Sequence, residues 1–175
     1  MAVIKSTNGG ISWPTQSFPA TGDYGTRCEA IAVGVSNPAI LYAGGQKNRE
    51  PALCRSANGG STWEGVTKNL VALLSRYDRV SAIWVSPYKP DAVVVGTSGV
   101  IFTCTVDGRS QSRTWNMTTI NDPTLDFAYD QPTGTIYAAT SRGVFSSDDE
   151  GATWLEVNDG LGYLRSTCID IDFHH

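Results

Sequence analysis

The chain has 175 residues, a mass of 18.8 kDa and a formal net charge of −4. A hydrophobic content of 41% is typical of a globular protein that can bury a core, and the acidic balance excludes the basic face that nucleic-acid binding requires. No apolar run is long enough to span a bilayer as a helix. Residues 1–5 lead directly into the first motif and leave no room for a signal peptide, so we expect a cytoplasmic chain, or a secreted one if it is cut from a longer parent.

Taken in chain order, strand-sized segments recur in groups of four with turn signals between them. Residues 3–5 and 11–13 are two predicted strands. Three full cycles follow, at 28–33, 40–44, 52–55 and 64–66; at 80–85, 92–96, 100–103 and from 114; and at 125–129, 135–139, 144–146 and 154–157. Residues 167–173 add one more strand, and residues 68–76 are predicted to be a loop insertion. Four strands in a period of about 40–50 residues predict an all-β fold, a β-propeller of antiparallel blades.

An eight-residue pattern, S-x-D-x-G-x-T-W, recurs between the third and fourth strands. Copies occupy residues 6–13, 56–63 and 147–154, and a damaged copy spans 105–115, where Arg109 takes the glycine position. Glycine tolerates positive φ in a tight reversal, and a short polar side chain accepts hydrogen bonds from turn N–H groups. The residues with these structural roles are Asn8, Asn58, Asp107 and Asp149 at the third position, and the tryptophans Trp13, Trp63, Trp115 and Trp154, which we expect to be buried.

The pattern resembles the Asp box, or BNR repeat, of sialidases, sortilin-type receptors, xyloglucanases and photosystem II assembly propellers, over nearly the whole chain. The resemblance implies that each motif lies at an outer hairpin, remote from the ligand face. We therefore expect residues 1–175 to form one partial propeller domain. Propellers usually close with about four to eight blades. The chain is thus expected to be a fragment of a larger propeller or, as we predict, half of a homodimer of about eight blades that covers the open edges.

Arginines precede three of the predicted first strands. Arg27, Arg79 and Arg165 each stand four residues before an isoleucine, and a tyrosine precedes each of them, at Tyr24, Tyr77 and Tyr163; residues 121–123 break the rule. The resemblance implies that the loops entering first strands lie on the ligand face. Guanidinium groups there could bind carboxylate, phosphate or sulfate, and the tyrosines could stack on sugars. The alternative is that each arginine pairs with an acid such as Glu29 or Asp78 and ties adjacent blades.

The sequence contains no convincing catalytic or metal-binding set. Glycoside hydrolysis usually needs two carboxylates about 5–9.5 Å apart. The candidates are Glu29, Asp126, Asp170 and Asp172, of which Asp126 and Asp170 align in successive cycles as neighbours on the inner wall. The spacings of Cys28, Cys54, Cys104 and Cys168 match no metal motif, and we expect four buried or half-buried thiols without disulfides. His174 and His175 end the chain, whether native or part of a tag, and no cofactor is predicted.

These observations favour a non-catalytic propeller module that binds a glycan or an anionic partner through an Arg/Tyr-rich face. Two alternatives stay open. The chain could be part of a glycoside hydrolase similar to sialidases or xyloglucanases, or it could be a scaffold for protein assembly.

Overall fold

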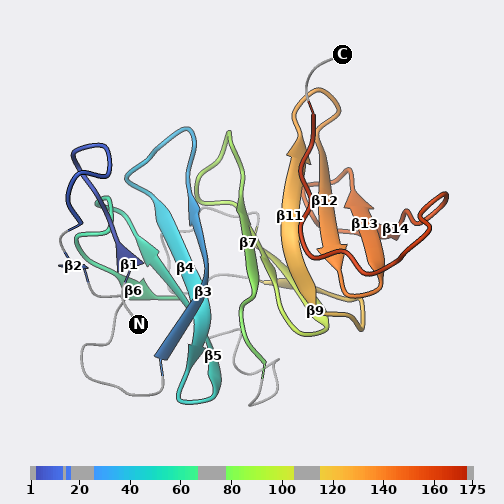
Figure 1. The fold of residues 1–175 in the computed structure, drawn as a ribbon, viewed down its shortest axis with the longest axis horizontal. Helices are drawn as coiled ribbons and strands as arrows, with labels where there is room; N and C mark the ends of the chain where they lie inside the picture. The colour runs from blue at the N-terminus through green and yellow to red at the C-terminus, as the bar shows by residue number, and fades with distance from the viewer. Residues whose placement is uncertain (1–2, 14, 17–25, 67–77, 105–114, 173–175) are drawn as a thin grey trace.

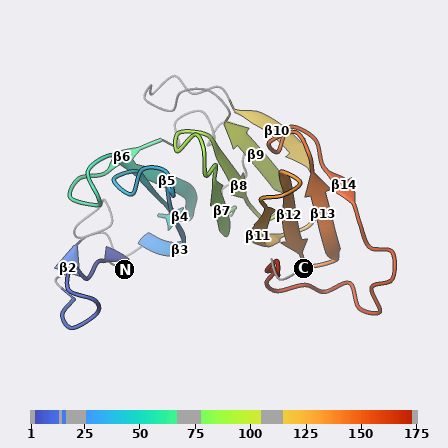
Figure 2. The same ribbon diagram turned by 90° about the horizontal axis from the view of Figure 1, so that it is seen from above.

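The structure is a computed structural model that describes residues 3–13, 15–16, 26–66, 78–104 and 115–172. Within these ranges the chain is all β, as expected, with three four-stranded antiparallel sheets and one two-stranded pair. Seen from above, the sheets stand side by side in an arch whose two ends face the same open side (Figure 2). No helix in the described part of the chain is long and apolar enough to cross a membrane.

Each four-stranded sheet, here called a blade, has its strands in chain order (Figure 1 and Figure 2). The leading pair is β1 (Val3–Ile4) with β2 (Thr15–Gln16). The first blade contains β3 (Thr26–Val33), β4 (Leu41–Lys47), β5 (Glu50–Ser56) and β6 (Glu64–Gly65). The second contains β7 (Ala82–Val85), β8 (Val93–Gly96), β9 (Val100–Cys104) and β10 (Asn116–Thr119). The third contains β11 (Thr124–Asp130), β12 (Thr135–Thr140), β13 (Gly143–Ser147) and β14 (Leu155–Glu156).

The hydrophobic core lies between blades. Successive residues of a strand point to opposite faces of its sheet. In β8, Val95 therefore joins the cluster shared with the first blade, around Tyr42 and Leu53, while Val94 joins the cluster shared with the third blade, around Ile136. The second blade is consequently covered on both faces.

Inner strands of neighbouring blades approach closely at equivalent glycines of the second strands. A Cβ on Gly96 would lie 2.6 Å from the Cβ of Thr124 in the third blade, and a Cβ on Gly44 would overlap the Val80 side chain that precedes β7. These contacts set how tightly the blades pack around the inner edge of the arch.

Two predicted strands are wrong in their bounds. Residues 11–13 belong to the turn, and the partner of β1 is Thr15–Gln16, because the turn runs through the motif tryptophan. The fourth strand of the third blade, predicted at 154–157, likewise starts only after Trp154, whereas that of the first blade starts at Glu64 as predicted.

The predicted strand at 167–173 is also absent over its described part, 167–172, because this segment has no antiparallel partner among the described residues. It nevertheless occupies the place of a first strand. The N–H of Ser166 donates to the carbonyl of Thr140 on the third blade at 3.2 Å. The equivalent bonds within the chain are Val80 N–H to Gly45 and Thr124 N–H to Thr97.

Candidate functional site

The repeated motif builds a rigid turn in each described copy. The hydroxyl oxygen at its first position accepts the glycine N–H at 2.7–2.9 Å, in Ser6–Gly10, Ser56–Gly60 and Ser147–Gly151. The oxygen at its third position accepts the N–H of the seventh residue at 2.8–2.9 Å, in Asn8–Ser12, Asn58–Thr62 and Asp149–Thr153. The fifth residue is left-handed as predicted, with φ near +88° in Gly10, Gly60 and Gly151. Asp107 and most of the damaged copy lie outside the described residues.

The acid at the third position of the third-blade turn, Asp149, accepts hydrogen bonds through both of its carboxylate oxygens. Burial raises the pKa of its carboxyl, but hydrogen bonds from the Thr153 side chain and backbone, the Ser147 hydroxyl and the Ala152 N–H outweigh burial. The net result is a pKa below the ordinary value of 3.8. This carboxylate therefore serves the turn.

The motif tryptophans pack onto the preceding blade. Trp115 and Trp154 are 8% and 9% exposed and lie in the clusters of the first–second and second–third junctions. Trp63 is half-buried, and the expectation of burial is wrong for Trp13, which is 58% exposed. Its indole N–H still donates to the Gly10 carbonyl, as that of Trp154 does to Gly151. This bond holds the Trp13 ring in the same orientation relative to its turn, but the described chain supplies no preceding blade for the ring to pack against.

The three predicted arginines hold equivalent places. Arg79 and Arg165 each directly precede the residue that donates the inter-blade hydrogen bond, Val80 or Ser166. Arg27 and Arg79 each lie four residues before an isoleucine, Ile31 or Ile83. These isoleucines are equivalent, because Ile31 pairs with Ala43 on the second strand of its blade as Ile83 pairs with Val95. We call this position the entry slot. In the third blade Pro123 fills it.

One arginine of the three takes part in an ion pair with a neighbouring blade. Arg79 Nε lies 3.0 Å from Glu29 Oε2 of the first blade, as the inter-blade tie alternative predicts. The Arg79 side chain is 53% exposed, and such pairs contribute about 0–1 kcal/mol. Arg27 and Arg165 are exposed, and no ion pair to either is found within the described ranges. Tyr163 is 91% exposed, whereas Tyr24 and Tyr77 fall in undescribed parts of the chain.

The entry slots lie at one end of the blades, here called the entry face, together with the hairpins between second and third strands. Those hairpins bring further cations that the sequence analysis missed: Lys47, Arg49 and Arg142. Acids on the same face are Glu29, Glu50, Asp78, Asp122 and Asp159. The opposite end carries Lys5, Arg55 and Lys89 with acids at Asp91, Asp130, Asp148, Asp149 and Glu150. Cations and acids are therefore mixed on the entry face, whereas acids outnumber cations at the opposite end.

The carboxylates considered for catalysis are partly engaged in backbone contacts. Asp126 accepts the N–H groups of Phe127 at 2.9 Å and Ile169 at 3.2 Å, and so ties β11 to the trailing segment. Asp170 accepts the N–H of Ile171. The predicted equivalence of Asp126 and Asp170 is wrong. Counted from the donors Thr124 and Ser166, Asp170 corresponds to Ala128, two residues beyond Asp126.

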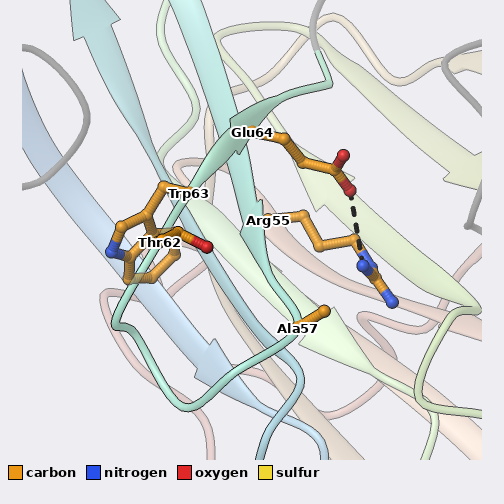
Figure 3. A pocket seen from close by; sticks show the side chains of 5 residues that line it. All are labelled: Arg55, Ala57, Thr62, Trp63 and Glu64. Carbon is orange, nitrogen blue, oxygen red and sulfur yellow. Dashed lines mark hydrogen bonds and ion pairs between the residues drawn. The ribbon is translucent and has the colours of Figure 1, made fainter.

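A pocket of about 280 Å³ lies beside the motif turn of the first blade, lined by Arg55, Ala57, Thr62, Trp63 and Glu64 (Figure 3). Arg55 is 5% exposed and donates from Nε and Nη2 to Asp91 Oδ1 of the second blade, at 3.0 and 2.6 Å. Its Nη1 also lies 3.3 Å from Glu64 Oε1. Burial lowers the pKa of the Arg55 guanidinium, but the hydrogen bond and the negative charge of Asp91 raise it by more. The net pKa is therefore above the ordinary value. We interpret this cluster as a tie between blades.

The cysteines are free, and three of them lie in buried or half-buried positions as predicted. Burial raises the pKa of Cys54 to about 12. The fourth, Cys168, is exposed, because the trailing segment has no blade beyond it. No group of three or more His, Cys, Asp and Glu side chains in the described ranges could bind a metal ion.

Comparison with known proteins identifies the fold. No family model and no curated protein matches the chain. An extracellular domain from B. thetaiotaomicron superposes with a TM-score of 0.71 at 16% identity, over 99% of this chain and 23% of that one. An ancestral GH74 enzyme superposes with a TM-score of 0.67 at 19% identity, over 89% and 21%. YCF48 from Cyanidioschyzon merolae gives 0.61 at 19% identity, over 89% and 52%.

The fold is that of a partial β-propeller. At these identities the likeness shows the fold alone. The chain spans about a fifth of the length of the GH74 enzyme and about half of YCF48.

Proposed function

We propose that the chain is a non-catalytic Asp-box propeller module whose entry face binds a glycan or an anionic partner through Arg27, Arg79, Arg165 and Tyr163. The observation that carries the proposal is that arginine occupies the same position, the entry slot, before three of the four first-strand positions. The slot is defined by the backbone bonds Val80 N–H to Gly45 and Ser166 N–H to Thr140.

The fold does not need arginine at this slot. In the third blade Pro123 occupies it, and the inter-blade bond from Thr124 to Thr97 still forms at 3.0 Å. An exposed side chain that the architecture does not require is available for binding. Guanidinium groups present planar donors that match carboxylate, sulfate and phosphate.

Further cations surround the slot arginines. Lys47, Arg49 and Arg142 join them on the entry face, beside the acids of that face, whereas acids outnumber cations at the other end. The entry face is therefore the less acidic end of a chain with a net charge of −4, which favours the approach of an anion there. Arg79 can exchange partners at low cost, because its ion pair with Glu29 is exposed.

The test measures the binding of sulfate and 3′-sialyllactose by calorimetry, with lactose as the neutral control. We expect Arg27→Ala and Arg79→Ala each to weaken binding about tenfold, since hydrogen bonds to charged groups contribute about 1.5–3 kcal/mol. Lys89→Ala is the matched control, an exposed cation at the opposite end. Glu29→Gln should strengthen binding, because it releases Arg79 from its acid.

Equal losses in the Lys89 and Arg79 variants, or equal affinity for lactose, would reject the proposed site. Release of sialic acid during the titration would instead favour the glycoside hydrolase alternative. Absence of binding to every small anion, together with capture of a folded protein, would favour an assembly scaffold.

A further inference from the structure

The two ends of the arch expose residues whose counterparts are buried inside it. Trp13 is 58% exposed, whereas Trp154 at the same motif position is 9% exposed. Ile4, two residues before its motif, is 50% exposed, whereas Phe145 packs in the second–third cluster. On the trailing blade Val157 is 40% exposed, whereas Val66 is 7% exposed. Both ends therefore present blade-contact faces that have no neighbouring blade within the described part of the chain.

The junction between the second and third blades shows what such faces contact. The Trp154 ring packs in a cluster with Val94 and Ile101. The Thr103 hydroxyl donates to the Gly151 carbonyl at 2.6 Å, and the Thr118 hydroxyl to the Ala152 carbonyl at 3.4 Å. One motif turn thus sits on the third and fourth strands of the blade before it.

Each of these contacts has a counterpart at the ends of the chain. On the trailing blade, the register β13–β14 makes Ser146, Leu155 and Val157 the equivalents of Thr103, Asn116 and Thr118. In the leading turn, Gly10, Ile11 and Trp13 are the equivalents of Gly151, Ala152 and Trp154. Polar Asn116 and Thr118 are therefore replaced by exposed apolar residues, with Leu155 at 71%, and Ile11 facing them from the other end is 87% exposed.

We propose that the leading turn of one copy docks on the trailing blade of a second copy, so that two chains close head to tail into a ring. In this interface the Ser146 hydroxyl donates to the Gly10 carbonyl of the partner subunit. Leu155 and Val157 then pack against Trp13 of the partner subunit and its Ile11. A hydroxyl-to-carbonyl bond is retained from the internal junction, and apolar contact replaces the polar pair.

The backbone layout agrees with this closure. The trailing segment lies where the first strand of a further blade would lie, and the hydrogen bond from Ser166 to Thr140 holds it there. β1 and β2 flank a motif turn and so correspond to the third and fourth strands of a blade. The two ends of the arch also face the same open side (Figure 2). The described residues supply no second strand to the composite blade, so the seam should be weaker than an internal junction and dissociate on dilution.

Closure would also complete the entry face, a consequence that rests on the proposed function. Within one chain, Pro123 separates Arg79 from Arg165 along the row of entry slots. In the ring, Arg165 of the partner subunit occupies the slot next to Arg27. Three successive slots then carry arginine at each seam, and an anionic ligand would contact both subunits.

Sedimentation equilibrium of the 175-residue chain tests the proposal over a micromolar range. We expect a mass of twice 18.8 kDa that falls on dilution. Trp13→Asp and Leu155→Asp should each yield monomer, because a head-to-tail seam uses both faces. Met117→Asp is the control, since Met117 is 48% exposed but lies on the edge strand of the middle blade. Circular dichroism should show that all three variants are folded.

A wild-type mass of one chain at every concentration overturns the proposal. Loss of the dimer in only one of the two end variants also overturns it, because a face-to-face dimer would use one end alone. A ladder of larger species overturns closure by two copies.

Anion binding is measured separately on the Trp13→Asp monomer. A dimer without anion binding contradicts the proposed function, and anion binding by a monomeric wild type contradicts the ring.

Discussion

The third residue of a motif turn acts as a hydrogen-bond acceptor, and its charge is dispensable. Asn58 and Asp149 receive the same backbone bond, from Thr62 and Thr153, at 2.8 Å. Only the side-chain bond reverses. Asn58 Nδ2 donates to the Thr62 hydroxyl, whereas the Thr153 hydroxyl donates to Asp149 Oδ2. The threonine at the seventh position accommodates either residue, because a hydroxyl both donates and accepts.

Asp149→Asn should therefore leave stability near pH 7 almost unchanged, whereas Asp149→Ala should cost about 2 kcal/mol in lost hydrogen bonds. The folded-state pKa of Asp149 lies below 3.8, so its stabilisation is present above that pH and is lost as the pH falls through the folded pKa. The Asn variant should lack this acid-dependent loss. Urea unfolding at neutral pH and at pH values below 3.8 measures both effects. An equal cost for the Asn and Ala variants would contradict the account.

At the scale of elements, a motif tryptophan belongs to the junction between blades rather than to a strand. Trp154 lies in the second–third cluster, with its ring centroid 5.9 Å from that of Phe127, while Trp13 has no blade before it. Truncation should therefore have very different costs at the two sites. Trp154→Ala should destabilise by about 3–5 kcal/mol, and Trp13→Ala by less than about 1 kcal/mol.

Denaturant unfolding at a protein concentration low enough for monomer measures this difference. Both variants lose the same side chain and the same indole hydrogen bond to a glycine carbonyl, so Trp13 controls for local turn effects. Similar costs at the two positions would show that the tryptophan stabilises its own turn and not the junction.

The elements that could be predicted from the sequence are those set by local chemistry. The second and third strands of each blade follow from runs such as residues 92–96, and the motif turns from their glycines and short polar residues. The fourth strands were predicted in the right places but too long, because β6 and β14 have only two residues each. The segment 167–172 has strand-like sequence, yet a strand needs a partner that the described chain does not supply.

The candidate site divides in the same way. Regular spacing was enough to find Arg27, Arg79 and Arg165, because each blade repeats the same path into its first strand. Lys47, Arg49 and Arg142 could not be found by spacing, since the strands β4 and β5 extend further before their turn than β12 and β13 do. The observation that places them on the same face is topological: the turn between second and third strands lies at the end where the first strand enters.

For the molecule as a whole, stability should depend on how many blade faces are covered. The second blade contacts blades on both sides, and every residue of β8 is buried. The first blade leaves Ile31 and Val33 exposed at 52% and 47%, although Val85, which corresponds to Val33, is 7% exposed in the second blade. Within the described residues, the leading pair, β1 and β2, packs against the first blade alone, and each of its strands has only two residues.

Hydrogen exchange should therefore be slowest in β8, intermediate in the first and third blades and fastest in β1, because amides open at free energies set by local burial. Mass spectrometry of exchanged peptides at low and high protein concentration measures this order. Head-to-tail association adds a second expectation. At high concentration the peptides that contain Trp13 and Leu155 should gain protection, while β8, already covered on both faces, should change little. Uniform exchange across the three blades would mean that they unfold as one unit, and would contradict the view that each junction adds its own increment of stability.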